Sequence, residues 1–139
     1  MLFERRPRLL RRLLVVEDEP LIAFDNEHAL VEAGFEVVAT VDRASAAIAA
    51  LESEQLDLVL ADLRLGGSDD GIEVARAAHA RNIPVLFVSG HCPPEAQKLA
   101  VGCLAKPYRH RDLLDAISAV EAHLTGKKRK FSEGLTLYP

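Results

Sequence analysis

Five polar residues that could do chemistry together each follow a short apolar run of the sequence. Glu17 and Asp18 follow the first run, Asp62 the third, Ser89 the fourth and Lys106 the fifth. If the runs are parallel strands, their carboxyl ends meet at one edge of a sheet, where such folds bind ligands. We therefore expect three carboxylates, one hydroxyl and one ammonium to converge at that edge.

The three carboxylates predict a metal site that accepts a phosphate. Carboxylates this close repel one another and cannot all stay ionised without a compensating cation. Mg²⁺ takes a few hard oxygen ligands while keeping several waters, so it is the expected ion. The oxygens of a phosphate could then be shared among the metal, the Lys106 ammonium and the Ser89 hydroxyl. Asp62 stands alone after its run, and because a carboxylate can form a covalent aspartyl phosphate, we predict that it is the nucleophile.

The elements that position these residues alternate between apolar runs and helical patterns. The runs are too short for helices and suit strands buried on both faces. Right-handed crossovers place helices on both faces of such a sheet, so the sequence predicts an α/β fold with a five-stranded parallel sheet. The fourth helix should be short or mobile, because Pro93 and Pro94 interrupt it. The expected strands are residues 13–16, 35–41, 58–61, 85–88 and 101–105, and the other four helices begin at Pro20, Ala44, Ile72 and Arg109.

Length and composition predict one domain. A chain of 139 residues that is 49% hydrophobic fits one compact core and leaves little room for a second. We expect the domain to span residues 13–126, after a basic lead at 1–12 and before a disordered basic tail at 127–139. No effector domain is expected after residue 126, so DNA-binding helices of a transcription factor have no place in the chain.

Charge is distributed unevenly along the chain. Residues 1–12 and 127–130 hold nine of the 17 basic residues, whereas residues 13–126 hold eight basic and 19 acidic residues. An acidic body repels nucleic acid, so we interpret the basic ends as solvated tails and expect no nucleic-acid partner.

The sequence predicts a cytoplasmic protein with no membrane partner. No apolar stretch reaches the roughly 20 residues that span a bilayer, and the opening residues lack the apolar segment and cleavage site of a signal peptide. Cys92 and Cys103 lack the paired spacing of a zinc site and do not make a disulfide framework. Reduced thiols are therefore expected at both positions.

Four short motifs in this order resemble the receiver domain of two-component response regulators. They are LVVEDE at 14–19, VLAD at 59–62, VSG at 88–90 and KP at 106–107, and the resemblance covers residues 13–124. It implies a flavodoxin-like, doubly wound (βα)5 sheet with strand order 2-1-3-4-5. It also implies phosphorylation by a sensor histidine kinase or a phosphotransfer protein, and no enzymatic activity beyond the chain's own phosphorylation and slow dephosphorylation.

The resemblance assigns roles around the metal. Asp62 is the implied phosphoacceptor and, together with Asp18, a direct ligand of Mg²⁺. Glu17 is implied to act on the metal through a water molecule. The backbone carbonyl of Arg64 is a further implied ligand.

The resemblance also assigns roles around the phosphate and implies the output. Ser89 is the implied switch hydroxyl and Lys106 the implied phosphate clamp, and the Lys106-Pro107 peptide bond is implied to be cis. The predicted function is that of a single-domain response regulator, a phosphoprotein that signals by contact with a downstream protein or by passing the phosphoryl group onward.

The sequence departs from the usual receiver pattern at three places. Cys103 stands on the fifth run where many receivers carry an aromatic switch residue, and the loop LRLGG at 63–67 lacks the usual proline. The segment FVSGHC at 87–92 is similar to a variant, often single-domain subgroup with a Phe-Ala-Thr-Gly-X-Tyr motif, except that it ends in a cysteine. In the family, the residues at Arg64 and His91 flank the path of the hydrolytic water.

Three other functions fit the residues less well. A phosphatase of the haloacid-dehalogenase kind also forms an aspartyl phosphate, but it needs a second aspartate where this chain has Arg64. The remaining alternative is a non-phosphorylated receiver-like binding module, which is expected to have lost Asp18, Asp62 or Lys106. A phosphohistidine at His28 is less favoured, because the first helix needs its inner face for packing.

Overall fold

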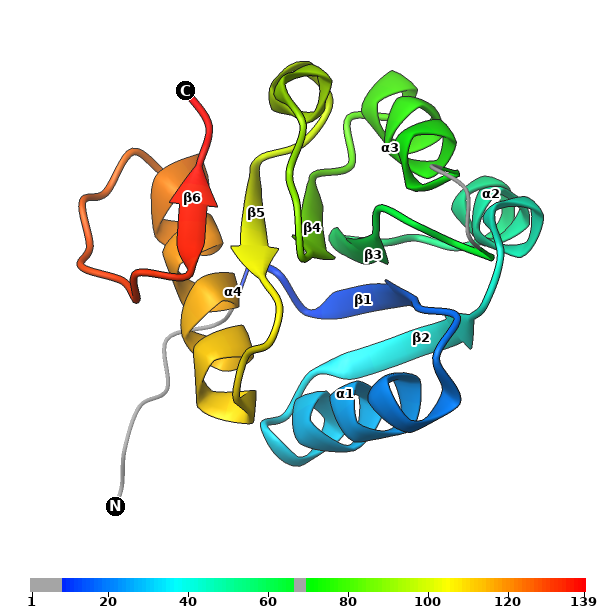
Figure 1. The fold of residues 1–139 in the computed structure, drawn as a ribbon, viewed down its shortest axis with the longest axis horizontal. Coiled ribbons are helices and arrows are strands. Elements are labelled where there is room, and N and C mark those ends of the chain that lie inside the picture. The colour runs from blue at the N-terminus through cyan, green and yellow to red at the C-terminus, as the bar shows by residue number, and fades with distance from the viewer. Residues whose placement is uncertain (1–8, 67–69) are drawn as a thin grey trace.

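Strands and helices alternate along most of the chain, as the sequence predicts (Figure 1). The computed structural model describes residues 9–66 and 70–139, so most of the basic lead at 1–12 lies outside the described residues. The elements are β1 (Arg12–Val16), α1 (Pro20–Glu32), β2 (Glu36–Val41), α2 (Ala44–Ser53), β3 (Leu58–Asp62), α3 (Gly71–Ala80), β4 (Val85–Ser89), the 3₁₀ helix η1 (Pro94–Lys98), β5 (Gly102–Ala105), α4 (His110–Leu124) and β6 (Leu135–Leu137).

Within the described residues, six strands form one sheet in the order β2-β1-β3-β4-β5-β6. The first five pair in parallel, which confirms the predicted strand order 2-1-3-4-5. β6 pairs antiparallel with β5 at the edge of the sheet. The prediction of a purely parallel, five-stranded sheet is therefore wrong by one strand, and the predicted disorder of the tail is wrong for residues 135–137.

Strand β6 fits against β5 because its side chains alternate and because β5 leaves room for its backbone. Leu135 is buried, Thr136 is exposed and Leu137 is half-buried, which is the period of two that a strand gives. On β5, a Cβ atom at Gly102 would lie 2.5 Å from the carbonyl oxygen of Thr136, so the absence of a side chain permits the pairing. A strand of three residues carries too little periodicity to be predicted from the sequence.

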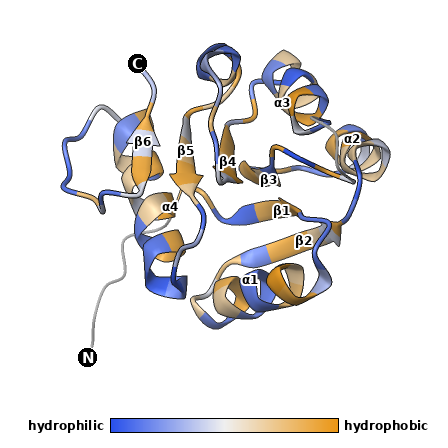
Figure 2. Cartoon of the chain, in the orientation of Figure 1, coloured by the Kyte–Doolittle hydropathy of each residue, from blue (hydrophilic) through white to orange (hydrophobic). Residues whose placement is uncertain are grey.

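Helices cover both faces of the sheet, and the apolar strands lie between them (Figure 2). α1 and α4 pack over one face, against Leu13 and Val15 of β1. α2 and α3 pack over the other face, against Leu14 and Val16. Successive residues of β1 thus point into different cores, as expected of a strand that is covered on both sides.

The helix boundaries follow the predicted signals. α1 begins at Pro20, and the chain leaves it through Gly34, whose φ of 96° is a left-handed conformation that favours glycine. The fourth helical segment, η1, is short as predicted, because Pro93 and Pro94 have no backbone N–H to donate. Among the described residues, no helix is both long and apolar enough to cross a membrane.

Candidate functional site

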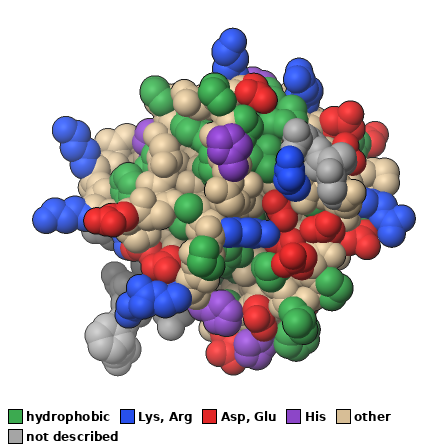
Figure 3. All heavy atoms as spheres, in the orientation of Figure 1, with side chains coloured by type: hydrophobic (Ala, Val, Ile, Leu, Met, Phe, Trp, Pro, Cys, Tyr) green, Lys and Arg blue, Asp and Glu red, His purple; other side chains and the backbone are tan. Residues whose placement is uncertain are grey.

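The carboxyl ends of four neighbouring strands bring the predicted polar residues to one edge of the sheet. Glu17 and Asp18 directly follow β1, and Asp62 and Ser89 are the last residues of β3 and β4. Lys106 directly follows β5. In the space-filling view, acidic side chains gather on this face beside a basic side chain, around the ends of β1 and β2 (Figure 3). The convergence that the sequence predicts is therefore present.

The ammonium of Lys106 bridges two of the carboxylates. Lys106 Nζ donates to Glu17 Oε1 and to Asp62 Oδ2, both at 3.0 Å. Glu17 and Asp62 are buried at 2% and 7% exposure, so neither carboxylate can rely on water for its charge. The backbone N–H of Lys106 donates to the Ser89 carbonyl at 2.9 Å, which fixes the start of the lysine side chain beside β4.

The acids form a cluster whose donor set suits Mg²⁺. Candidate ligand atoms of Glu17, Asp18 and Asp62 all lie within 4.8 Å of one another. Hard carboxylate oxygens in small number are what Mg²⁺ accepts, and three carboxylates with one ammonium leave an excess of negative charge. The residues present thus fit the predicted ion. The carbonyl of Arg64 as a further ligand stays a prediction.

The environment of the cluster shifts two pKa values. Burial raises the pKa of Glu17 above its usual range, although the hydrogen bond from Lys106 acts in the opposite direction. Burial alone would lower the pKa of Lys106, but its hydrogen bonds to Asp62 and Glu17 outweigh burial and hold the pKa above its usual value. Lys106 is therefore a cation at neutral pH, while Glu17 is destabilised in its charged form.

Two glycines that the sequence reasoning did not assign hold the loop after β3. The N–H of Gly66, at a positive φ of 63°, donates to Asp18 Oδ2 at 2.8 Å. Gly71 donates its N–H to the Leu63 carbonyl at 3.0 Å, and a Cβ there would lie 2.6 Å from Leu63 Cα. The glycine-rich stretch after Asp62 was the available signal, but the sequence does not say which backbone group each glycine approaches.

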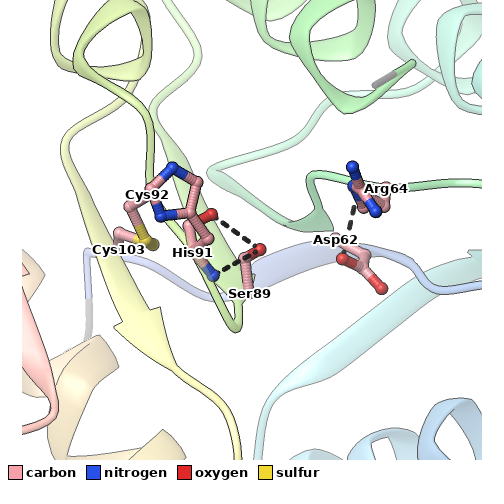
Figure 4. The surroundings of a disulfide bond; sticks show 6 residues. All are labelled: Asp62, Arg64, Ser89, His91, Cys92 and Cys103. Carbon is pink, nitrogen blue, oxygen red and sulfur yellow. Dashed lines mark hydrogen bonds between the residues drawn. A yellow bond between two sulfur atoms is a disulfide. The ribbon is translucent and has the colours of Figure 1, made fainter. Parts of the chain in front are cut away.

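The loop after β3 also supplies a backbone donor to the predicted nucleophile. The N–H of Arg64 donates to Asp62 Oδ1 at 3.2 Å, so each oxygen of the Asp62 carboxylate accepts one hydrogen bond, the other coming from Lys106. Together these two bonds orient the carboxylate at the end of β3. The side chain of Arg64 is exposed above it (Figure 4).

The hydroxyl of Ser89 is engaged by its own loop. Ser89 Oγ donates to the His91 carbonyl at 2.9 Å and accepts from the His91 N–H at 3.3 Å (Figure 4). A cavity beside it is lined by this segment and by the loop after β3, including Arg64, Gly90 and Pro93. Ser89 thus lies at the predicted edge with its hydroxyl bonded to backbone.

The two cysteines form a disulfide next to this loop (Figure 4). Cys92 lies three residues after Ser89, and Cys103 lies on β5. The Cα atoms of the two cysteines are 6.5 Å apart. The prediction of reduced thiols is therefore wrong for this structure. The physical reason is the path of the chain: residues 90–101 leave β4 and return to the neighbouring strand β5, which brings together two residues that are 11 apart in the sequence.

His28, the alternative phosphohistidine, contacts residues of its own helix. It is exposed on α1, stacks on Phe24 and lies 3.5 Å from Glu32 Oε1. These contacts within one helix are typical of a surface histidine.

The sequence of this chain matches one known protein family. The family model of the response regulator receiver domain matches residues 13–118. The chain belongs to this family. The resemblance of the sequence motifs is thereby confirmed, and with it the assignment to two-component signal transduction. The cis peptide bond that the resemblance implies is also present, between Lys106 and Pro107.

Individual receiver proteins resemble this one in sequence and in structure. The transcriptional regulatory protein PdtaR of Mycobacterium tuberculosis is 30% identical over 113 residues, which are 77% of this chain and 55% of PdtaR. A response regulator receiver domain protein (CheY-like) from Methanospirillum hungatei has a TM-score of 0.74 at 27% identity, covering 84% of this chain and 98% of that one. A response regulator receiver protein from Sinorhizobium medicae has a TM-score of 0.69 at 31% identity, covering 81% and 94%. The receiver thus spans about half the length of the curated relatives it matches.

Membership in the family indicates the general function of the site. Receiver domains are signalling modules that bind Mg²⁺ at an acidic pocket and interact with histidine kinases or phosphotransfer proteins. In this receiver, Glu17, Asp18 and Asp62 form an acidic cluster that could hold such an ion.

Proposed function

We propose that this receiver, spanning residues 13–126, accepts a phosphoryl group from a histidine kinase or a phosphotransfer protein onto Asp62. It would act in the cytoplasm and signal by contact with a downstream protein or by passing the phosphoryl group onward. One observation carries the proposal. The Asp62 carboxylate ends a buried central strand, 3.0 Å from the Lys106 ammonium and within the acidic cluster.

The reaction forms one bond and breaks one. A carboxylate oxygen of Asp62 attacks the phosphorus of the phosphohistidine, and the P–N bond breaks with its electron pair going to the imidazole nitrogen. Bound Mg²⁺, held by Asp18 and Asp62 directly and by Glu17 through water, would neutralise charge on the phosphoryl oxygens. The chain catalyses only this transfer and the slow hydrolysis of its own acyl phosphate.

Two side chains change partner in this proposal. Lys106, which bridges Glu17 and Asp62, would donate to a phosphoryl oxygen. This hydrogen bond would be strong because both of its partners are charged. Ser89 would exchange the His91 carbonyl for another phosphoryl oxygen. The phosphorylated state therefore differs from the described one at the start of the segment that follows β4.

Labelling by a small phosphodonor tests the proposal. The intact mass of the chain should rise by one phosphoryl group after treatment with acetyl phosphate and Mg²⁺, and stay unchanged when the Mg²⁺ is chelated. Asp62→Asn should abolish the gain. Asp42→Asn is the matched control, because Asp42 is an exposed aspartate that follows β2 at the same edge, outside the cluster.

The same measurement also tests the clamp and the alternative. Lys106→Ala should be labelled at least about tenfold more slowly, because it loses a charge-assisted contact to the phosphoryl group. Lys127→Ala, an exposed lysine beyond α4, should be labelled like wild type. A folded wild-type chain that gains no mass with Mg²⁺ would contradict the proposal and favour a non-phosphorylated binding module.

A further inference from the structure

The disulfide joins the segment after the candidate switch residue to the strand beside it. Cys92 follows Ser89 by three residues, and Cys103 sits in the middle of β5, paired in register with Phe87 of β4. Their Cα–Cα separation of 6.5 Å lies inside the usual range for a disulfide. The disulfide therefore closes a loop of the chain that begins three residues after Ser89 and ends on β5.

The surroundings of the two sulfurs differ. Cys103 is buried at 2% exposure, while Cys92 is half-buried at the rim of the segment. A small reagent in solution therefore reaches Cys92 first. Cys103 is close enough to complete the bond afterwards.

The sheet around Cys103 does not depend on the disulfide. β5 pairs with β4 on one side and with β6 on the other, so backbone hydrogen bonds hold Cys103 in place from both sides. The stretch between β4 and η1, residues 90–93, carries Cys92 and is non-helical. It includes Pro93, and Pro94 begins η1, so neither residue has a backbone N–H to donate. Opening the disulfide would release this stretch and leave the sheet paired.

We propose that Cys92 and Cys103 form a reversible redox site that exchanges with low-molecular-weight disulfides and controls the freedom of Ser89 to reach the phosphoryl group. The control of phosphorylation rests on the function proposed above. In the reducing cytoplasm proposed for this protein, a disulfide of this kind is a transient, regulatory one.

The exchange balances in two steps. The Cys92 thiol loses its proton, and the thiolate attacks one sulfur of the small disulfide, whose S–S bond breaks to release a small thiol. Cys103 then loses its proton and attacks the Cys92 sulfur, which releases the second small thiol. Two protein thiols are oxidised to one disulfide, and one small disulfide is reduced to two thiols.

The link to the phosphoryl site runs through His91. Ser89 Oγ donates to the His91 carbonyl, and the next residue is the tethered Cys92. The disulfide therefore fixes the backbone that holds the Ser89 hydroxyl away from a phosphoryl group. Reduction frees residues 90–101 and lets Ser89 change its acceptor.

The first test uses the full chain and oxidised glutathione as the probe. Wild type that has first been reduced should lose two hydrogens in intact mass and retain no glutathione, and a reducing phosphine should reverse the change. Cys103→Ala should retain one glutathione on Cys92, because the resolving thiol is gone. Cys92→Ser should retain none, because Cys103 is buried. Wild type that keeps both thiols, or Cys92→Ser that is modified as readily as Cys103→Ala, would overturn the site.

The second test compares oxidised and reduced wild type in two independent readouts. Amide hydrogen exchange of residues 90–101 should be faster in the reduced form, and this readout needs no phosphate. Labelling by acetyl phosphate with Mg²⁺ should be slower in the oxidised form by about three- to tenfold, the range of one neutral hydrogen bond. Cys92→Ser should be labelled at the reduced rate whether or not glutathione disulfide is added.

The two proposals fail in different ways. Equal exchange and equal labelling in the two redox states would overturn the control of Ser89. Absence of labelling in both states would overturn the proposed phosphorylation, while the mass and exchange measurements would still decide the redox site.

Discussion

Glu17 Oε1 and Lys106 Nζ lie 3.0 Å apart, and this contact joins the buried end of β1 to the residue that follows β5. The bond only partly offsets the cost of burying the carboxylate, since the pKa of Glu17 is still raised by burial. A site in which burial disfavours the charged form of a carboxylate is typical of a place that binds a cation.

Neutralising Glu17 should stabilise the Mg²⁺-free protein at neutral pH. A raised pKa in the folded state means that the contribution of Glu17 to the free energy of unfolding falls as pH rises through the folded value. Glu17→Gln should therefore have a higher Tm than wild type at pH 7. The difference should vanish below the usual glutamate pKa of about 4.3, where the side chain is protonated in both states.

Thermal unfolding across a pH series without Mg²⁺ measures this effect. Glu52→Gln is the control, because Glu52 is exposed on α2 and its neutralisation should leave the Tm close to that of wild type. A Tm of Glu17→Gln equal to or below that of wild type at pH 7 would mean that Lys106 fully compensates Glu17.

Mg²⁺ should stabilise the fold through the acidic cluster. At a concentration of 100 times its Kd, an ion that binds only the folded state adds about 2.7 kcal/mol to the free energy of unfolding. Asp18→Ala should lose most of this Mg²⁺-dependent gain, because it removes one of three clustered carboxylates. Calorimetry with and without Mg²⁺ gives the difference for each variant, with Asp42→Ala as the matched control. An unchanged Mg²⁺ response in Asp18→Ala would place the ion elsewhere.

The side chains of Arg64 and His91 should slow the loss of the phosphoryl group. Both are exposed, and both line the cavity between the loop after β3 and the segment after β4. We expect the double variant Arg64→Ala, His91→Ala to lose its label at least about twofold faster than wild type, because water then reaches the phosphorus more freely and a charged contact is lost. The decay of intact mass after removal of acetyl phosphate measures the rate.

A matched pair on another surface controls for this effect. Arg76 and His79 are exposed on α3, so replacing both with alanine should leave the lifetime unchanged. If the Arg64 and His91 variant keeps its label as long as wild type, these side chains do not set the rate.

Phosphorylation should order residues 90–100 in the reduced protein. Cys103 is too small to act as an aromatic lever, so we expect the signal to travel through the backbone that Ser89 anchors. With beryllofluoride as the phosphate mimic, hydrogen exchange should slow in this segment. The effect should disappear in Ser89→Ala and persist in Cys103→Ala. Equal exchange with and without the mimic would end this account of signalling.

The sheet order and the meeting of the polar residues were predictable from the sequence. The apolar runs were short, and those that became β3 and β4 are wholly buried. A parallel sheet places the residues after such runs at one edge. Asp62, Ser89 and Lys106 all lie where this rule puts them. Their roles in phosphoryl transfer stay predictions.

The features that the sequence did not predict are the disulfide, β6 and the close approach at Gly71. Each depends on which part of the fold the chain contacts after a loop. The disulfide needs residues 90–101 to fold back on β5, and β6 needs the tail to meet Gly102. Likewise, Gly71 is required by the backbone of Leu63, which is eight residues earlier in the sequence. Periodicity and spacing describe single helices and strands, so they carry no information about contacts between segments that are distant in the sequence.

Chemical identification of the phosphorylated residue tests the central claim most directly. The chain is treated with acetyl phosphate and Mg²⁺ and then with borohydride, which reduces an aspartyl phosphate to homoserine, and its peptides are mapped by mass spectrometry. We predict homoserine at position 62 alone, and none in a sample prepared without Mg²⁺. Homoserine at any other aspartate, or a labelled protein with position 62 unchanged, would contradict the assignment of Asp62 as the phosphoryl acceptor.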